Sequence, residues 1–259
     1  LKRPPVSDLA FRRAVAGALD YKKIAQSLLA KSGKTASAGF VPTALTGGNR
    51  PPELVFSPGQ SRRTLTEAGY EDTDQDGLLN HPVSGTNIRL KLLARSDLEG
   101  MAPLLPIISH NLGQIGIGLD VEWADLSTWI VRVRKKEHDL VLFRTTPWGM
   151  LMEAGYGTGY FDSRRSGGGT LANVEDPEFH RLCDKILETT DPDIRVRLYQ
   201  KILQYYAGHL PAVALCWAMN AYPFSNRLSI PVVNPVEGGI LNRETLAQIR
   251  KLPAEQVSP

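Results

Sequence analysis

Three strand-like segments alternate with two helix-like segments in the middle of the chain, and this alternation limits the possible folds more than any other feature. The strands are expected at 87–93, 119–123 and 139–143, and the helices at 101–115 and 126–136. In the first strand, Ile88, Leu90 and Leu92 occupy every second position, which is the spacing of a strand with one buried face. The third strand is apolar after its first residue, as buried parallel strands are. This order of elements predicts an α/β layer.

Helical periodicity also covers both sides of this layer. Helices are expected at 7–31, 57–70, 177–189 and 192–207, with a short one at 244–250. Glu178 and Asp193 place a negative charge in the first turn of two of these helices, where it favours the helix dipole. A fourth apolar strand is expected at 210–217, whereas the Gly-, Ser- and Pro-rich stretch 32–52 predicts a loop.

Charge and hydropathy exclude two classes of partner. The 259 residues carry 30 basic and 27 acidic side chains, which gives a net charge of +3. A dedicated nucleic-acid-binding protein normally has a concentrated basic face, so no nucleic-acid partner is expected. No run of 18 or more apolar residues occurs, so no helix of this chain is expected to insert into a membrane.

The chain has none of the common catalytic motifs. It contains no G-x-S-x-G elbow, no phosphate-binding Walker loop and no H-E-x-x-H sequence. Its two cysteines, Cys183 and Cys216, lie in no metal-binding pattern, and whether they pair stays open. We therefore expect neither an enzyme nor a cofactor. A hydrolase whose catalytic groups meet only in the folded chain is kept as an alternative from another class.

Four stretches in order resemble the solute-binding proteins of peptide and nickel ABC importers (family 5). The first is FRRAVAGALDYKKI at 11–24, which is similar to R-x-A-x-x-x-A-[LI]-[DN]-x-x-x-I. The second is LTEAGY with the acidic turn after it, at 65–77. The third joins LGQIGI at 112–117 to the HDLVL strand at 138–142. The fourth joins DPDIRVRLY at 191–199 to LPAV at 210–213. The resemblance covers about residues 6–220.

The resemblance implies a lobe of the periplasmic-binding-protein-like type II fold, with a mixed sheet flanked by helices. Residues 1–220 would form the second ligand-binding lobe, and 221–259 would be a C-terminal segment returning toward the first lobe. That first, N-terminal lobe is expected to be absent from this chain. The implied function is capture of a peptide or similar small ligand between two lobes and its delivery to a membrane permease. The implied location is the periplasm, or the outer surface of a Gram-positive cell through a membrane anchor.

A metal chelate is the alternative ligand within the same family. The sequence FRTTPWG at 143–149 is similar to the R-T-W-G segment of the nickel-binding branch. Two additional residues separate Arg144-Thr145 from Trp148-Gly149, and the P-Y-D-P-H continuation of that branch is absent.

The candidate ligand residues follow the third predicted strand. Ligands of open α/β sheets bind beyond the carboxyl ends of the strands, which is where Arg144, Thr145 and Trp148 fall. A guanidinium can hold a carboxylate with two hydrogen bonds, and an indole offers a flat apolar wall. The glycine-rich stretch 149–169 adds Tyr156 and Tyr160 as candidate aromatic contacts, although it could equally be a surface loop.

One metal-binding pattern is present in part. Asp72, Asp74 and Asp76 with Gly77 match the start of an EF-hand calcium loop. The twelfth position, where such a loop has a bidentate Glu, is Val83. An acidic turn between helix and strand is therefore the simpler interpretation, and calcium binding is a weak prediction.

Overall fold

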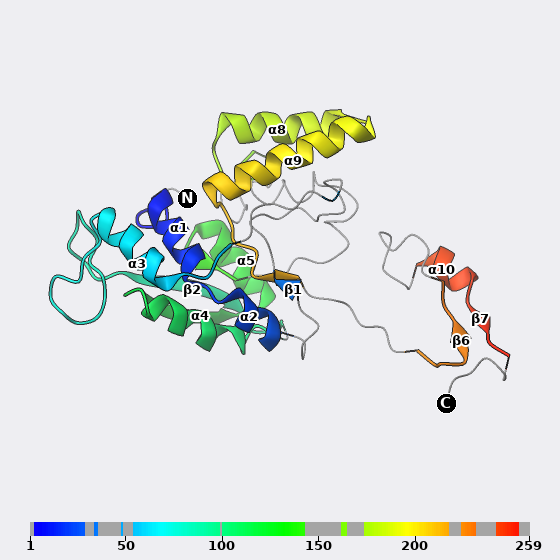
Figure 1. The fold of residues 1–259 in the computed structure, drawn as a ribbon, viewed down its shortest axis with the longest axis horizontal. Helices are drawn as coiled ribbons and strands as arrows, with labels where there is room; N and C mark the ends of the chain where they lie inside the picture. Colours follow the sequence, from blue (N-terminus) through cyan, green and yellow to red (C-terminus); the bar gives the residue numbers. More distant parts are fainter. Residues whose placement is uncertain are drawn as a thin grey trace.

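The central sheet has the three strands that the sequence predicts. The computed structural model describes residues 3–28, 34–35, 48, 54–98, 100–142, 162–164, 174–217, 224–231 and 242–253 (Figure 1). Strands β2 (Arg89–Arg95), β3 (Gly118–Ala124) and β4 (Leu140–Val141) are parallel and lie in the order β3-β2-β4. Leu92 of the central strand aligns with Val121 on one side and Leu140 on the other. The expected α/β lobe is confirmed.

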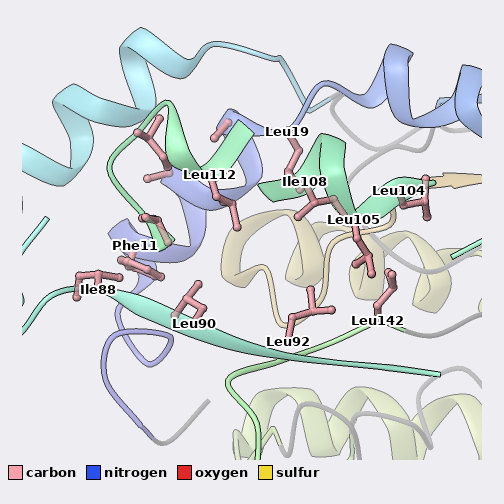
Figure 2. Packing of buried hydrophobic residues seen from close by; sticks show 14 of the residues in the cluster. Phe11, Leu19, Ile88, Leu90, Leu92, Leu104, Leu105, Ile108, Leu112 and Leu142 are labelled. Carbon is pink, nitrogen blue, oxygen red and sulfur yellow. The ribbon is translucent and has the colours of Figure 1, made fainter. Parts of the chain in front are cut away.

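Helices cover both faces of this sheet. Leu90, Leu92 and Ala94 of β2 pack with helices α1 (Leu9–Ala18), α2 (Tyr21–Ser27) and α4 (Leu104–Gly113) in one hydrophobic cluster. Figure 2 shows the side chains of Leu90 and Leu92 between strand β2 and helix α4. Leu93 points to the opposite face, where it packs with Trp129 and Val133 of α5 (Leu126–Lys135). The alternation along β2 therefore sets which helix covers which face.

The helix expected at 7–31 is wrong in one respect, because it is two helices. Helix α1 ends before Leu19, whose backbone is extended, and Asp20 caps α2 by accepting the Lys23 N–H at 3.0 Å. The Asp20 N–H donates to Oδ1 of Asn111 in α4, also at 3.0 Å. Leu19 and Ile24 are both buried, so the apolar periodicity continues across the break between the two helices. The side chain of Asn111, distant in sequence, stabilises that break.

The expected fourth strand is also shorter than predicted. Leu210 ends the preceding helix in the left-handed conformation, with φ 45°, so only Cys216–Trp217 (β5) forms a strand. It pairs antiparallel with β1 (Lys34–Thr35), which lies in the stretch predicted to be a loop. Two-residue strands paired across the chain leave no local signal in the sequence. No disulfide joins Cys183 to Cys216 in this part of the structure.

The other predicted helices are confirmed. They are α3 (Pro58–Glu67), α8 (Pro177–Glu188), α9 (Pro192–His209) and α10 (Arg243–Ala247). Asp176 and Asp191 cap α8 and α9 by accepting backbone N–H groups through their side chains. Near the C-terminal end, β6 (Leu228–Ser229) pairs antiparallel with β7 (Arg250–Lys251) beside α10 (Figure 1).

Candidate ligand-binding edge of the sheet

The order of the strands defines one edge as the candidate site. From β2 the chain runs through α4 to β3 on one side, and from β3 it runs through α5 to β4 on the other side. The connections therefore reverse direction between β2 and β4, and ligands of open α/β sheets bind at the carboxyl ends of the strands at such a switch point. The Leu142 N–H donates to the Leu93 carbonyl at 3.1 Å, two residues before Arg95 ends β2.

Arg95 is the cationic group that the structure places at this edge. Its Nε and Nη2 donate to the two carboxylate oxygens of Asp97, at 3.0 and 2.5 Å. The Arg95 side chain is 18% exposed, against 43% for Asp97. The hydrogen bonds raise the pKa of Arg95, and the same bonds lower the pKa of Asp97. Nη1 makes no hydrogen bond to any residue described, so the guanidinium is held on one edge and has donors left on the other.

The amino end of α5, at the same edge of the sheet, is capped by Asp125. Asp125 accepts hydrogen bonds from Ser127 Oγ at 2.6 Å and from the Thr128 N–H and Oγ1, both at 3.0 Å. These bonds lower the pKa of Asp125 to about 2, and the bond from the Ser127 hydroxyl has the largest effect. Because this carboxylate caps the helix end and places a negative charge there, the amino end of α5 is a poor site for an anionic ligand.

The ligand residues predicted from sequence lie outside the described residues, and they stay predictions. They are Arg144, Thr145, Trp148, Tyr156 and Tyr160. Sequence reasoning missed Arg95, although the rule that selected Arg144 applies to it equally. Arg95 directly follows an alternating apolar strand, and two residues later comes an acidic partner.

The three aspartates of the acidic turn do come together. Their carboxylates each place an oxygen within 4.8 Å of the others. Asp72 accepts the Gly77 N–H at 3.0 Å, and Asp76 accepts from Leu78 N and from the Asn87 side chain. The turn precedes β2, so it lies at the amino end of the sheet, away from Arg95. Val83, at the twelfth position, is 89% exposed and brings no carboxylate. Calcium binding stays a prediction.

A serine, a histidine and an aspartate also meet in the described part of the chain, but not as a catalytic triad. Ser163 Oγ and Asp162 Oδ1 both lie 3.5 Å from the same nitrogen of His180, Nε2. A triad requires the serine and the carboxylate on different ring nitrogens, within about 3.2 Å. Asp162 is instead bound by Arg164 through three nitrogen–oxygen contacts of 2.8 to 3.1 Å. This cluster gives the hydrolase alternative no support.

None of the helices described is long and apolar enough to cross a membrane.

Comparison with known proteins relates the chain to one family. Residues 1–167 match the family described as "Bacterial extracellular solute-binding proteins, family 5 Middle". Heme-binding protein A of Haemophilus influenzae is 22% identical over 241 residues, which are 90% of this chain and 41% of that protein.

Solved structures of binding proteins have the same fold. The periplasmic oligopeptide-binding protein of Thermotoga maritima matches with a TM-score of 0.75 and 19% identity, over 96% of this chain and 51% of that one. A dipeptide-binding protein of Pseudoalteromonas sp. SM9913, in complex with Met-Leu, matches with a TM-score of 0.73 and 22% identity, over 96% and 46%. The chain therefore spans about half the length of the relatives it matches.

Proposed function

Because this chain belongs to the bacterial extracellular solute-binding proteins of family 5, we propose that it forms the second lobe of a protein that captures a small ligand for an ABC importer. Residues 1–220 form that lobe, and 221–259 return toward a first lobe in the complete protein. The ligand is held between the lobes, and its contacts to both favour the closed state. No bond is made or broken, and the closed protein delivers the ligand to a membrane permease. The protein acts in the periplasm, or anchored outside a Gram-positive cell.

The observation that carries this proposal is Arg95 at the switch point of the sheet. Asp97 fixes the guanidinium, which keeps a permanent positive charge, and Nη1 has no partner among the described residues, at the edge where ligands of such sheets bind. A guanidinium suits a carboxylate, the group that peptides carry at their C-terminus. In our proposal Arg144 and Thr145 add further polar contacts, while Trp148, Tyr156 and Tyr160 supply aromatic walls. The ligand is a peptide or a similar carboxylate-bearing molecule.

The test measures binding in the complete two-lobed protein. Mass spectrometry of the freshly purified protein identifies any ligand that copurifies, and calorimetry with the dipeptide Met-Leu measures affinity. We expect Arg95→Ala to weaken binding at least about tenfold, or about 1.4 kcal/mol, because a charged hydrogen bond is lost. Arg89→Ala is the matched control. Arg89 is at the other end of the same strand and also pairs with an aspartate, Asp120, so its removal should leave the affinity unchanged.

Two outcomes would contradict the proposal. If Arg95→Ala and Arg144→Ala both leave every measured affinity unchanged, the site is elsewhere. If Arg89→Ala weakens binding as much as Arg95→Ala, the effect comes from the strand and not from the carboxyl edge.

A metal chelate is the second candidate ligand, because of the R-T and W-G pairs at 144–149. Organic chelators also carry carboxylates, so Arg95 fits either ligand. Calorimetry with a nickel–histidine chelate separates the two, since a peptide-binding protein should give no heat with it.

A further inference from the structure

Helices α8 and α9 share a hydrophobic cluster of their own. Phe179, Ile202 and Tyr206 are at its centre, and all three are almost completely buried. The described members of this cluster all lie within residues 174–212, whereas Val213 and Leu215 already pack against the cluster of the sheet. In Figure 1 the two helices lie along each other and apart from the strands. Apolar packing thus divides the described lobe in two.

Charged groups attach a short upstream segment to these helices. Arg164 binds Asp184 of α8 through two nitrogens, at 3.0 and 2.9 Å, and also donates to the His180 carbonyl at 3.1 Å. The same guanidinium holds Asp162, which forms an isolated bridge with Val174. Residues 162–164 and 174–212 therefore form one group, which we call the hairpin unit. The sheet with helices α1, α2, α3, α4 and α5 is the sheet unit.

Among the residues described, the main polar contact between the two units is at the end of α9. Arg12 of α1 donates to the His209 carbonyl from Nε at 3.0 Å and from Nη2 at 2.8 Å, while Nη1 binds the Val6 and Ser7 carbonyls. Arg13 adds a longer bond, of 3.4 Å, to the Gly208 carbonyl. The last carbonyls of a helix have no partner within the helix and carry its negative end, so an arginine suits them.

Little apolar packing supports this contact. A small cluster joins Ala16 of α1 to Leu210, with Leu54, Ala207 and Val213 at its margin. Only five side chains take part and two of them are alanines, so among the described residues this cluster contributes much less than the cluster inside either unit.

We propose that the hairpin unit opens as one cooperative unit while the sheet unit stays folded, and that the hydrogen bonds of Arg12 hold the two units together. This inference does not depend on which ligand the protein binds, or on whether it binds one. It requires that the free energy of opening the hairpin unit is smaller than that of unfolding the sheet, because few contacts join the two units in the described part of the chain.

The test is amide hydrogen exchange of the whole protein, followed by mass spectrometry at low concentrations of urea. In the unchanged protein, amides of α8 and α9 should exchange through an opening that leaves β2, β3 and α4 protected. Arg12→Ala should speed exchange in α8 and α9 at least about tenfold, because charged hydrogen bonds to the helix end are lost, and should leave the strands unchanged. Arg63→Ala is the control. Arg63 is exposed on α3 and, among the described residues, hydrogen-bonds to Gln60 of its own helix alone, so no change is expected.

The proposal is wrong if amides of the hairpin unit and of the sheet unit exchange at the same rate and with the same dependence on urea concentration. This applies both to the unchanged protein and to Arg12→Ala. If Arg12→Ala does not fold, Phe179→Leu decides, because Phe179 lies wholly within the cluster of the hairpin unit. Faster exchange confined to α8 and α9 supports a separate opening, and equal acceleration of the strands rules it out.

Discussion

The sheet unit and the hairpin unit are stabilised in different ways. In the sheet unit, the main apolar cluster draws on α1, α2, β2 and α4, and each described ion pair, such as Arg89 with Asp120, keeps both side chains at least partly exposed. In the hairpin unit two neighbouring helices form the apolar cluster, and a wholly buried carboxylate, Asp162, depends on Arg164. Loss of a charge should therefore affect the two units differently. Exposed ion pairs contribute little to stability, whereas a buried charge that loses its partner is costly.

The largest expected effect is loss of apolar volume from the sheet unit. Leu112 is fully buried in α4, within the cluster that includes Phe11 and Leu90. Leu112→Ala should lower the free energy of unfolding by about 3 kcal/mol, because it removes buried methyl groups and leaves a cavity. Urea unfolding followed by circular dichroism measures this. Leu187→Ala, on the exposed side of α8, is the control and should cost less than about 1 kcal/mol. Similar losses in both variants would show that burial in α4 contributes little.

A smaller effect, confined to the hairpin unit, is expected from Arg164→Ala. The substitution removes the guanidinium that neutralises the buried Asp162 and also releases Asp184. We expect a loss of about 2 kcal/mol, because a buried charged acceptor loses its hydrogen bonds. Hydrogen exchange should show the loss in α8 and α9 and not in β2. Arg181→Ala, an exposed arginine on the same helix, should have no effect. Equal acceleration in the strands would contradict the division into two units.

The smallest expected effect is a loss of stability of the hairpin unit when the pH is lowered. Burial raises the pKa of Asp162, but the hydrogen bonds and the charge of Arg164 outweigh it, so this pKa lies below its usual value. A carboxyl group with a lowered pKa in the folded state stabilises it above about pH 4, and this contribution is lost as the pH falls further. Exchange in α8 should therefore rise between about pH 4 and pH 3, after correction for the intrinsic rate, and the rise should be smaller in Arg164→Ala. An equal rise in both proteins would exclude Asp162 as the cause.

The fold was predictable where the determining pattern is local. Alternation along Leu90 and Leu92 gave the central strand, and an apolar run gave β4. The break at Leu19 was not predictable, because it depends on a bond from Asp20 to a side chain 91 residues away. The contact of Arg12 with His209 spans 197 residues, and no sequence pattern predicts it.

The sequence predicts at which edge of the sheet the candidate site lies, but not which described side chain is available there. The rule that ligands bind at the carboxyl ends of parallel strands selects one edge of the sheet from the sequence, and the strand order of the structure selects the same edge. Which cation is available there depends on hydrogen bonds that sequence alone does not show. Asp97 orients Arg95, while Asp125 caps the amino end of α5 by accepting the Thr128 N–H.

The capping of α5 by Asp125 has a consequence for how this kind of lobe can diversify. A helix end that recognises anions through its backbone offers the same chemistry whatever its side chains are. Here a carboxylate already caps that helix end, so in our proposal the positive charge at the edge comes from a side chain at the last position of a strand. In our proposal, exchange of that one residue would change the cargo while the core stays intact. In that proposal, the edge is the part of the lobe where a substitution most readily changes ligand specificity.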